Sequence, residues 1–184
     1  MNDRAEASPI GGTTTRPLVV IGVGNTMRRD DGVGPAVIDA LRERSPTVDD
    51  ALVELLTLDG ESTGLVEAWR HRFAAIVIDA SKGPGPPGAI RRLDASRDHL
   101  PSSPSVTSWH AAGVGPAIAL AEELDLRPRA VIVFAVDVAD LSPGEGLSPL
   151  VAQAVRATAE RVEAELADLR RSMEAASIPD KLTP

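Results

Sequence analysis

The chain has 184 residues, 43% of them hydrophobic, which is enough for one globular domain with its own core. Only 2% are aromatic, so aliphatic side chains must build that core. The net charge of −8 argues against nucleic acid or an anionic membrane surface as the main partner. Cysteine is absent, which excludes disulfides, thiolate nucleophiles and cysteine-bound metals and fits a reducing, cytoplasmic location.

The ends of the chain differ from its middle. Residues 1–16 are polar and lack the apolar stretch of a secretory signal, so we interpret them as a disordered leader. Residues 17–171 are predicted to form a single domain, and residues 172–184 a flexible tail. No apolar run approaches the roughly 20 residues that a membrane span needs. We expect a monomer.

Strand and helix patterns alternate along the domain. Residues 18–23 are continuously apolar, which is typical of a strand buried on both faces. A glycine turn with Asn25 follows, then Asp30 and Asp31, and then helical spacing that begins at Val33. Further strands are predicted over 52–58, 74–78, 89–93 and 130–136, with helices over 63–70, from His110 onward and from Pro149 onward.

This alternation predicts an α/β fold. We expect a single three-layer α/β/α domain with a mainly parallel, twisted five-stranded sheet and helices on both faces. Residues 89–93 form an edge strand that can be antiparallel. In such sheets ligands bind at the carboxyl ends of the strands.

That rule brings together three residues that lie far apart in the sequence. Asp31 follows the first strand, Asp79 ends the third, and His110 follows a long polar loop over 94–109. Two carboxylates and one imidazole suit a borderline divalent ion such as Zn or Ni better than Mg. The same trio could instead perform acid/base chemistry, with one aspartate activating water.

Each residue also has a purely structural interpretation. Asp31 could cap a helix, Asp79 could bind a loop, and Asn25 could take a turn conformation that asparagine tolerates. His110 could be a satisfied structural histidine. The chain contains no Gly-x-Ser-x-Gly or His-Glu-x-x-His segment, so serine-nucleophile and common zinc-protease frameworks are unsupported.

Five segments resemble the hydrogenase maturation proteases. The longest begins at Ile21 and reads Ile-Gly-Val-Gly-Asn-Thr-Met-Arg-Arg-Asp-Asp-Gly-Val-Gly. The others are Leu-Asp-Gly-Glu-Ser-Thr-Gly over 58–64, Ile-Val-Ile-Asp-Ala over 76–80, Ser-Trp-His-Ala-Ala-Gly over 108–113, and the stretch over 141–149. Glu61 and Ser62 stand where a plainer Gly-Thr pair is common in the family, and Arg28 and Arg29 precede the aspartates.

The resemblance implies an endopeptidase that removes the C-terminal extension of a nickel–iron hydrogenase large-subunit precursor. It implies metal positions at Asp31, Asp79 and His110, with Asp31 and Asp79 also as catalytic candidates of an aspartate-type or metal-assisted peptidase. The nickel would come from the substrate; Zn or Cd could replace it in a crystal, and no organic cofactor is expected. Asp59 and Gly60 would help recognise the substrate, and we predict the same role for Asn25.

Two alternatives remain at this point. One is a non-catalytic metallochaperone or maturation scaffold of the same fold. The other is a nucleotide-binding protein that uses the first glycine turn. The turn lacks a third glycine at the right distance, and Asp30 and Asp31 occupy the place where phosphate would approach.

Overall fold

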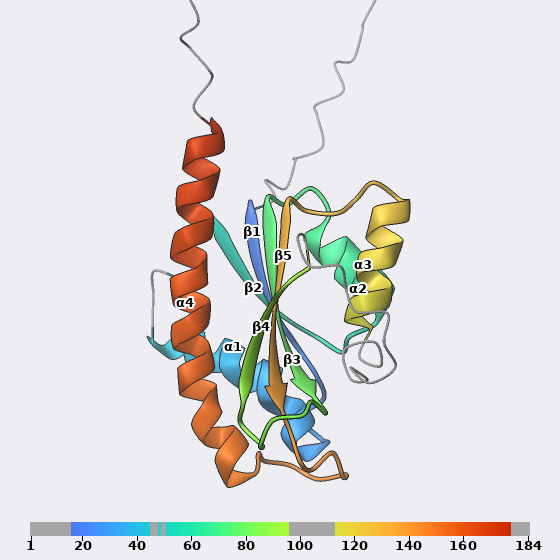
Figure 1. The fold of residues 1–184 in the computed structure, drawn as a ribbon, viewed down its shortest axis with the longest axis vertical. Helices are drawn as coiled ribbons and strands as arrows, with labels where there is room; N and C mark the ends of the chain where they lie inside the picture. Colours follow the sequence, from blue (N-terminus) through green and yellow to red (C-terminus); the bar gives the residue numbers. More distant parts are fainter. Residues whose placement is uncertain (1–15, 45–47, 49–50, 96–112, 178–184) are drawn as a thin grey trace, which may run out of the picture.

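The fold is built on one five-stranded sheet (Figure 1). The computed structural model describes residues 16–44, 48, 51–95 and 113–177. The strand order is β2-β1-β3-β5-β4, with parallel pairing throughout except between β4 and β5. The strands are β1 (Leu18–Val23), β2 (Val53–Leu58), β3 (Ala74–Ser81), β4 (Ile90–Asp94) and β5 (Ala130–Asp137). The predicted mainly parallel sheet with an antiparallel edge strand is confirmed.

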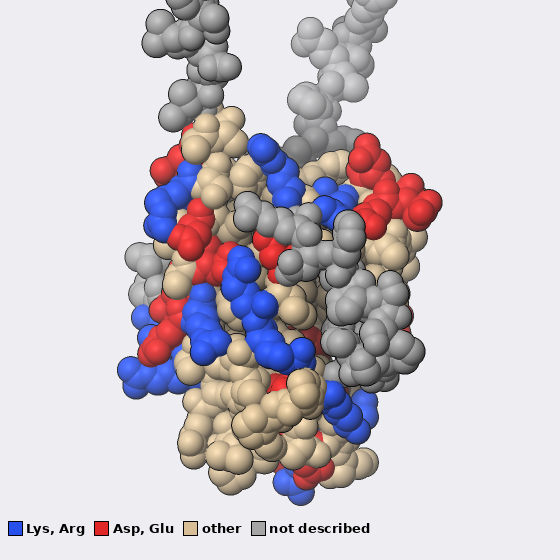
Figure 2. Space-filling view, in the orientation of Figure 1, with Lys and Arg blue, Asp and Glu red and all other residues tan. Residues whose placement is uncertain are grey.

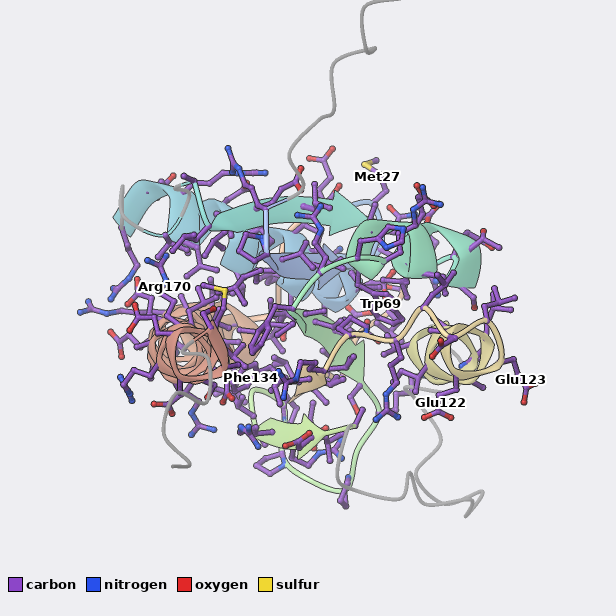
Figure 3. The ribbon with its side chains drawn as sticks, turned by 90° about the horizontal axis from the view of Figure 1, so that it is seen from above. Met27, Trp69, Glu122, Glu123, Phe134 and Arg170 are labelled. Atoms are coloured by element: carbon purple, nitrogen blue, oxygen red, sulfur yellow. The ribbon has the colours of Figure 1, made fainter. Side chains whose placement is uncertain are left out.

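Helices cover both faces of this sheet. They are α1 (Val33–Arg44), α2 (Ser62–Trp69), α3 (Val114–Glu123) and α4 (Pro149–Ser177), and a short 3-10 turn, η1 (Arg29–Gly32), precedes α1. The sheet and its helices enclose two separate cores of mostly aliphatic side chains. One contains residues of α1 and α4, and the other contains residues of α2 and α3. Phe134 is buried in the first core and Trp69 in the second, and Figure 3 shows both inside the molecule while Met27 lies at its outside. The three-layer prediction is therefore confirmed.

Two glycines set how closely α1 lies on β1. A Cβ atom added to Gly22 would lie 2.4 Å from the Gly34 carbonyl oxygen, and one added to Gly34 would lie 2.3 Å from the Val23 carbonyl oxygen. Both distances are shorter than any real Cβ contact, so side chains here would push the helix off the strand. This close contact holds η1, and with it Asp30 and Asp31, directly at the carboxyl end of β1.

Two predicted boundaries near the site are wrong. The predicted third strand ends at Asp79, but β3 continues to Ser81 because its last residues still pair with Ala135, Val136 and Asp137 of β5. The predicted helix opens at His110, but α3 begins at Val114. Gly113 has φ of +82°, a left-handed conformation that cannot continue an α-helix. His110 itself lies outside the described residues.

Two corrections also apply at the ends of the domain. Arg16, assigned to the leader, is bound to the sheet: its Nη1 donates to the Val53 carbonyl oxygen at 2.8 Å. Residues 172–177, assigned to the tail, belong to α4, which runs to Ser177. This segment contains no helix-breaking residue before Pro179, so nothing in it stops the helix earlier.

Candidate functional site

The site lies where the chain direction across the sheet reverses. From β1 the chain passes through α1 to β2 on one side, and it then returns through α2 to β3 on the other side. Neighbouring strands with connections to opposite faces leave a crevice at their carboxyl ends, where open α/β sheets bind ligands. Asp31 follows β1 and Asp79 lies near the end of β3, so the two predicted carboxylates flank this crevice.

Asp31 is held by the glycine turn that precedes it. Its Oδ2 accepts a hydrogen bond from the Asn25 backbone N–H at 3.1 Å and lies 3.9 Å from Nη1 of Arg28. The side chain of Asp31 remains 21% exposed. A Cβ atom at Gly24 would lie 1.8 Å from the Asp31 carbonyl oxygen, so only glycine fits the turn. The described bonds of this carboxylate thus go to the turn and not to the first turn of α1.

Asn25 shapes the same turn. Its Oδ1 accepts a hydrogen bond from the Met27 backbone N–H at 2.9 Å, which is an Asx-turn. The turn conformation considered from the sequence is therefore present. A role for Asn25 in substrate recognition stays a prediction.

Asp79 is a buried carboxyl group with an unsatisfied oxygen. It is 3% exposed, and its Oδ2 has no hydrogen-bond partner within the described part of the chain. Burial, opposed by the hydrogen bond from the Ala80 backbone N–H and aided by the negative charge of Asp31, raises the pKa of Asp79 to about 8. The side chain is consequently protonated at neutral pH when nothing else occupies the crevice. A cation placed between Asp31 and Asp79 would favour the ionised form.

Asp30 has the opposite environment, although it is the direct neighbour of Asp31. It is fully buried and accepts four hydrogen bonds: from the backbone N–H groups of Ala139 (3.2 Å), Asp140 (3.1 Å) and Ser148 (2.6 Å), and from the Ser148 hydroxyl (3.0 Å). Burial alone would raise the pKa of Asp30, but these bonds outweigh it and lower the pKa. Asp30 therefore anchors the loop between β5 and α4.

The loop after β2 reaches toward α3. Gly60 has φ of +90°, and its carbonyl oxygen would lie 1.8 Å from a Cβ atom at Gly113. The Ser62 hydroxyl donates to the Gly113 carbonyl oxygen at 3.1 Å, while Asp59 Oδ1 accepts the Glu61 backbone N–H at 3.1 Å. The predicted recognition residues Asp59 and Gly60 thus lie beside the segment that leads into α3. Their role in recognition stays a prediction.

The third predicted metal ligand cannot be placed. His110 precedes Gly113 by three residues and falls in the undescribed segment 96–112. Within the described residues no group of three histidine, cysteine, aspartate or glutamate side chains could hold a metal ion. The roles of Asp31, Asp79 and His110 as metal ligands all stay predictions.

Sequence reasoning missed a polar cluster beside Asp79. Asp137, buried at the end of β5, accepts a hydrogen bond from Nη2 of Arg91 at 2.9 Å, and the same nitrogen donates to the Ser81 hydroxyl at 2.6 Å. The signal was present, because Asp137 follows an apolar strand just as Asp79 does. Arg91 gave no such signal, since its position depends on the pairing of β4.

Charged side chains are unevenly distributed over the face shown in Figure 2. In Figure 2 acidic and basic side chains mix over the upper part of the face shown, and the lower end, where the parallel strands finish, is mostly uncharged. A cavity of about 480 Å³ lies at the other end of the sheet, against Phe73, Arg129 and Leu169, and is not part of this site. Among the described helices none is long and apolar enough to cross a membrane.

Comparisons with known proteins identify the family. The family model described as HycI, hydrogenase maturation protease, matches residues 36–165. The hydrogenase expression/formation protein HupD of Thiocapsa roseopersicina is 29% identical over 143 residues, which cover 75% of this chain and 62% of that relative. The chain thus spans less than two thirds of the length of this relative.

Solved structures agree with the family match. The hydrogenase maturating endopeptidase HybD from E. coli superposes with a TM-score of 0.66 at 27% identity, covering 84% of this chain and 93% of that one. The [NiFe] hydrogenase maturation protease HybD from Thermococcus kodakarensis has a TM-score of 0.66 at 19% identity, covering 80% and 97%, and it supports the fold. With a family model that matches most of its length, this chain belongs to the hydrogenase maturation protease family.

Proposed function

We propose that this protein is an endopeptidase that removes the C-terminal extension of a nickel–iron hydrogenase large-subunit precursor after nickel insertion. It senses the nickel through Asp31, Asp79 and His110. The observation that carries the proposal is the buried Oδ2 of Asp79, which has no partner within the described residues and belongs to a side chain whose pKa is raised by the charge of Asp31. A divalent cation supplied by the substrate would satisfy this oxygen and offset the repulsion between the carboxylates.

The donor set suits a transient ligand. Two carboxylates and one imidazole provide three protein ligands, with no cysteine in the chain to raise the affinity. The site is then completed by groups of the precursor that already hold the nickel. Nickel is thus part of the substrate and acts as a recognition element, which would make cleavage conditional on complete metal insertion.

The carboxylates also supply the chemistry for peptide hydrolysis. Burial favours the protonated form of Asp79 and a bound cation would favour the ionised form, so binding of the nickel would free a carboxylate that can accept a proton from water. Because the charge of Asp31 acts on Asp79, we assign acid/base chemistry to the pair without naming either residue as the base. Whether the peptidase is aspartate-type or metal-assisted, both routes use the same two residues.

The test uses purified protein, precursor with and without nickel, and intact mass as the readout. The protease is first treated with a chelator, which is then removed. We expect it to shorten the nickel-loaded precursor at an unchanged rate and to leave the nickel-free precursor intact. A treated protease that requires added Zn and then cuts the nickel-free precursor would contradict substrate sensing. Binding without any loss of mass would instead identify a scaffold.

A variant tests the undescribed ligand. His110→Ala should abolish shortening of the nickel-loaded precursor while the melting temperature stays unchanged. The matched control is His71→Ala: His71 is an exposed residue after α2, and its loss should leave processing intact. Full processing by folded His110→Ala would remove His110 from the site.

A further inference from the structure

A second polar group lies on the same face and at the same edge as Asp79. The strand register aligns Asp79 with Ala135 and Ala135 with Arg91, so the three residues form one row across β3, β5 and β4. Residues directly opposite each other in neighbouring strands point to the same face of a sheet. The middle residue, Ala135, carries only a methyl group, so no large side chain stands between Asp79 and Arg91. At about 4.8 Å per strand, their Cα atoms are roughly 10 Å apart.

The Arg91 side chain is held firmly in this row. Its Nη2 donates to the Ser81 hydroxyl at 2.6 Å and to Asp137 Oδ1 at 2.9 Å. The other carboxylate oxygen of Asp137 accepts the Gly85 backbone N–H at 2.8 Å. A Cβ atom at Gly83 would lie 2.2 Å from Asp137 Oδ1, so the glycine loop closes over this pair. The guanidinium is therefore preorganised.

The fixed guanidinium still has donors to offer. Arginine carries five N–H groups, and the two described bonds use only Nη2. Nε is buried and has no partner within the described part of the chain. Because Nε is buried, an incoming acceptor would reach Nη1, which makes no described bond and is not among the buried unpartnered atoms; the side chain as a whole is 28% exposed. Asp137 already balances the positive charge, and the site therefore suits a neutral hydrogen-bond acceptor better than a second carboxylate.

We infer that Arg91 binds a main-chain carbonyl oxygen of the precursor, on the side of Asp79 opposite to Asp59. The inference rests on the proposed function, because it places the precursor chain across the strand ends. Asp59 follows β2 and Arg91 lies in β4, the two edge strands, with Asp79 on a central strand between them. An extended chain advances about 3.3 Å per residue, so the bound carbonyl lies roughly three residues from the group nearest Asp79.

The neighbouring arginine provides a matched control. Arg92 is the next residue of β4 and therefore points to the opposite face, where its Nε and Nη2 donate to Glu165 of α4 at 2.6 and 2.8 Å. Both arginines thus lie in β4, and each forms an ion pair with an acidic residue of another element. Only Arg91 shares a face with Asp79.

The test measures the dissociation constant of nickel-loaded precursor for three variants, from association and dissociation rates recorded by rapid mixing before the precursor is shortened. Arg91→Gln alone would leave Asp137 buried and unpaired, so the main variant is Arg91→Gln with Asp137→Asn, and its control is Arg92→Gln with Glu165→Gln. We expect the main variant to bind at least roughly tenfold more weakly and the control to bind like the wild type. Arg91→Lys keeps the positive charge beside Asp137 but loses the planar guanidinium with its several fixed N–H donors. This variant should bind as weakly as the main variant.

Three results would overturn the inference. They are unchanged binding by the folded main variant, wild-type binding by Arg91→Lys, or an equal loss in the control. Melting temperatures confirm that each variant is folded. The difference between wild type and main variant should persist at high salt, since a loss confined to low salt would indicate a bound carboxylate. If the wild type binds the precursor without shortening it, the proposed function fails while the binding comparison still tests Arg91.

Discussion

Two buried aspartates of this molecule have opposite environments. Asp30 is 0% exposed and accepts four hydrogen bonds from the loop between β5 and α4. Asp79 is 3% exposed and leaves one oxygen without a described partner. Hydrogen bonds lower the pKa of Asp30 despite its burial, whereas burial raises the pKa of Asp79 to about 8. Burial of a carboxylate is therefore not by itself a sign of function; the lack of a partner distinguishes the candidate site from the structural anchor.

The largest effect is expected from Asp79→Asn. Between the ordinary pKa of 3.8 and the folded-state pKa of about 8, the folded protein holds a proton that the unfolded chain has released. Wild-type stability should thus fall as pH rises through this window, by on the order of 5 kcal/mol in total. The amide does not titrate, so the variant should gain stability relative to wild type as pH rises, while losing processing. Chemical denaturation at about pH 5 and about pH 9 measures the free energies of unfolding of wild type and variant. If their difference did not change with pH, the contrast between Asp79 and Asp30 would be wrong.

Asp30→Asn should act in the opposite direction. The amide places an N–H₂ group against backbone donors, and the variant should lose on the order of 3 kcal/mol at neutral pH. Because the folded-state pKa of Asp30 is lowered, its contribution is present above the ordinary value of 3.8 and is lost as pH falls through the folded-state pKa. The deficit of the variant should shrink in acid. Denaturation midpoints across pH measure this trend, and a deficit that grows in acid would contradict it.

The smallest effect is expected from Ser148→Ala. It removes the hydroxyl bond to Asp30 at 3.0 Å and keeps the backbone N–H bond at 2.6 Å. We expect a loss of about 1 kcal/mol, since the other donors still satisfy the carboxylate. Ser142→Ala is the matched control, because its hydroxyl binds Asp140 at the surface, and it should change stability by less than about 0.5 kcal/mol. Equal losses of stability for both variants would show that the hydroxyl bond to the buried Asp30 contributes no more than a bond at the surface.

Much of the fold could be predicted because its determinants are local. Continuous aliphatic runs mark β1, β3 and β5, and helical spacing marks α1 and α4. The meeting of Asp31 and Asp79 also followed from the sequence, since the carboxyl ends of parallel strands share one edge. The start of α3 did not follow, because it depends on Gly113 packing against Gly60, 53 positions earlier in the chain.

The remaining site residues depend on long-range partners. Asp30 and Asp31 are adjacent and chemically identical, and their roles are separated by the approach of the loop between β5 and α4, which donates hydrogen bonds to Asp30 from as far as Ser148, 118 positions away. Arg91 and Arg92 are likewise indistinguishable in the sequence. Which of them shares a face with Asp79 is decided by the antiparallel register of β4 on β5. Single-sequence patterns carry no information on such register.

The close contact between α1 and β1 has a consequence for how mutations at this site would be tolerated. Gly22 and Gly34 allow the contact, and any side chain at either position would collide with backbone atoms. Asp31 makes no comparable demand on packing, since it is partly exposed and contacts the turn. A mutational scan scored by the amount of folded protein would therefore reject changes at the glycines and accept many at Asp31, whereas under the proposed function a scan scored by shortening of the precursor would reject both. A degenerate descendant of this chain could thus keep its glycine motif intact long after it had lost its activity.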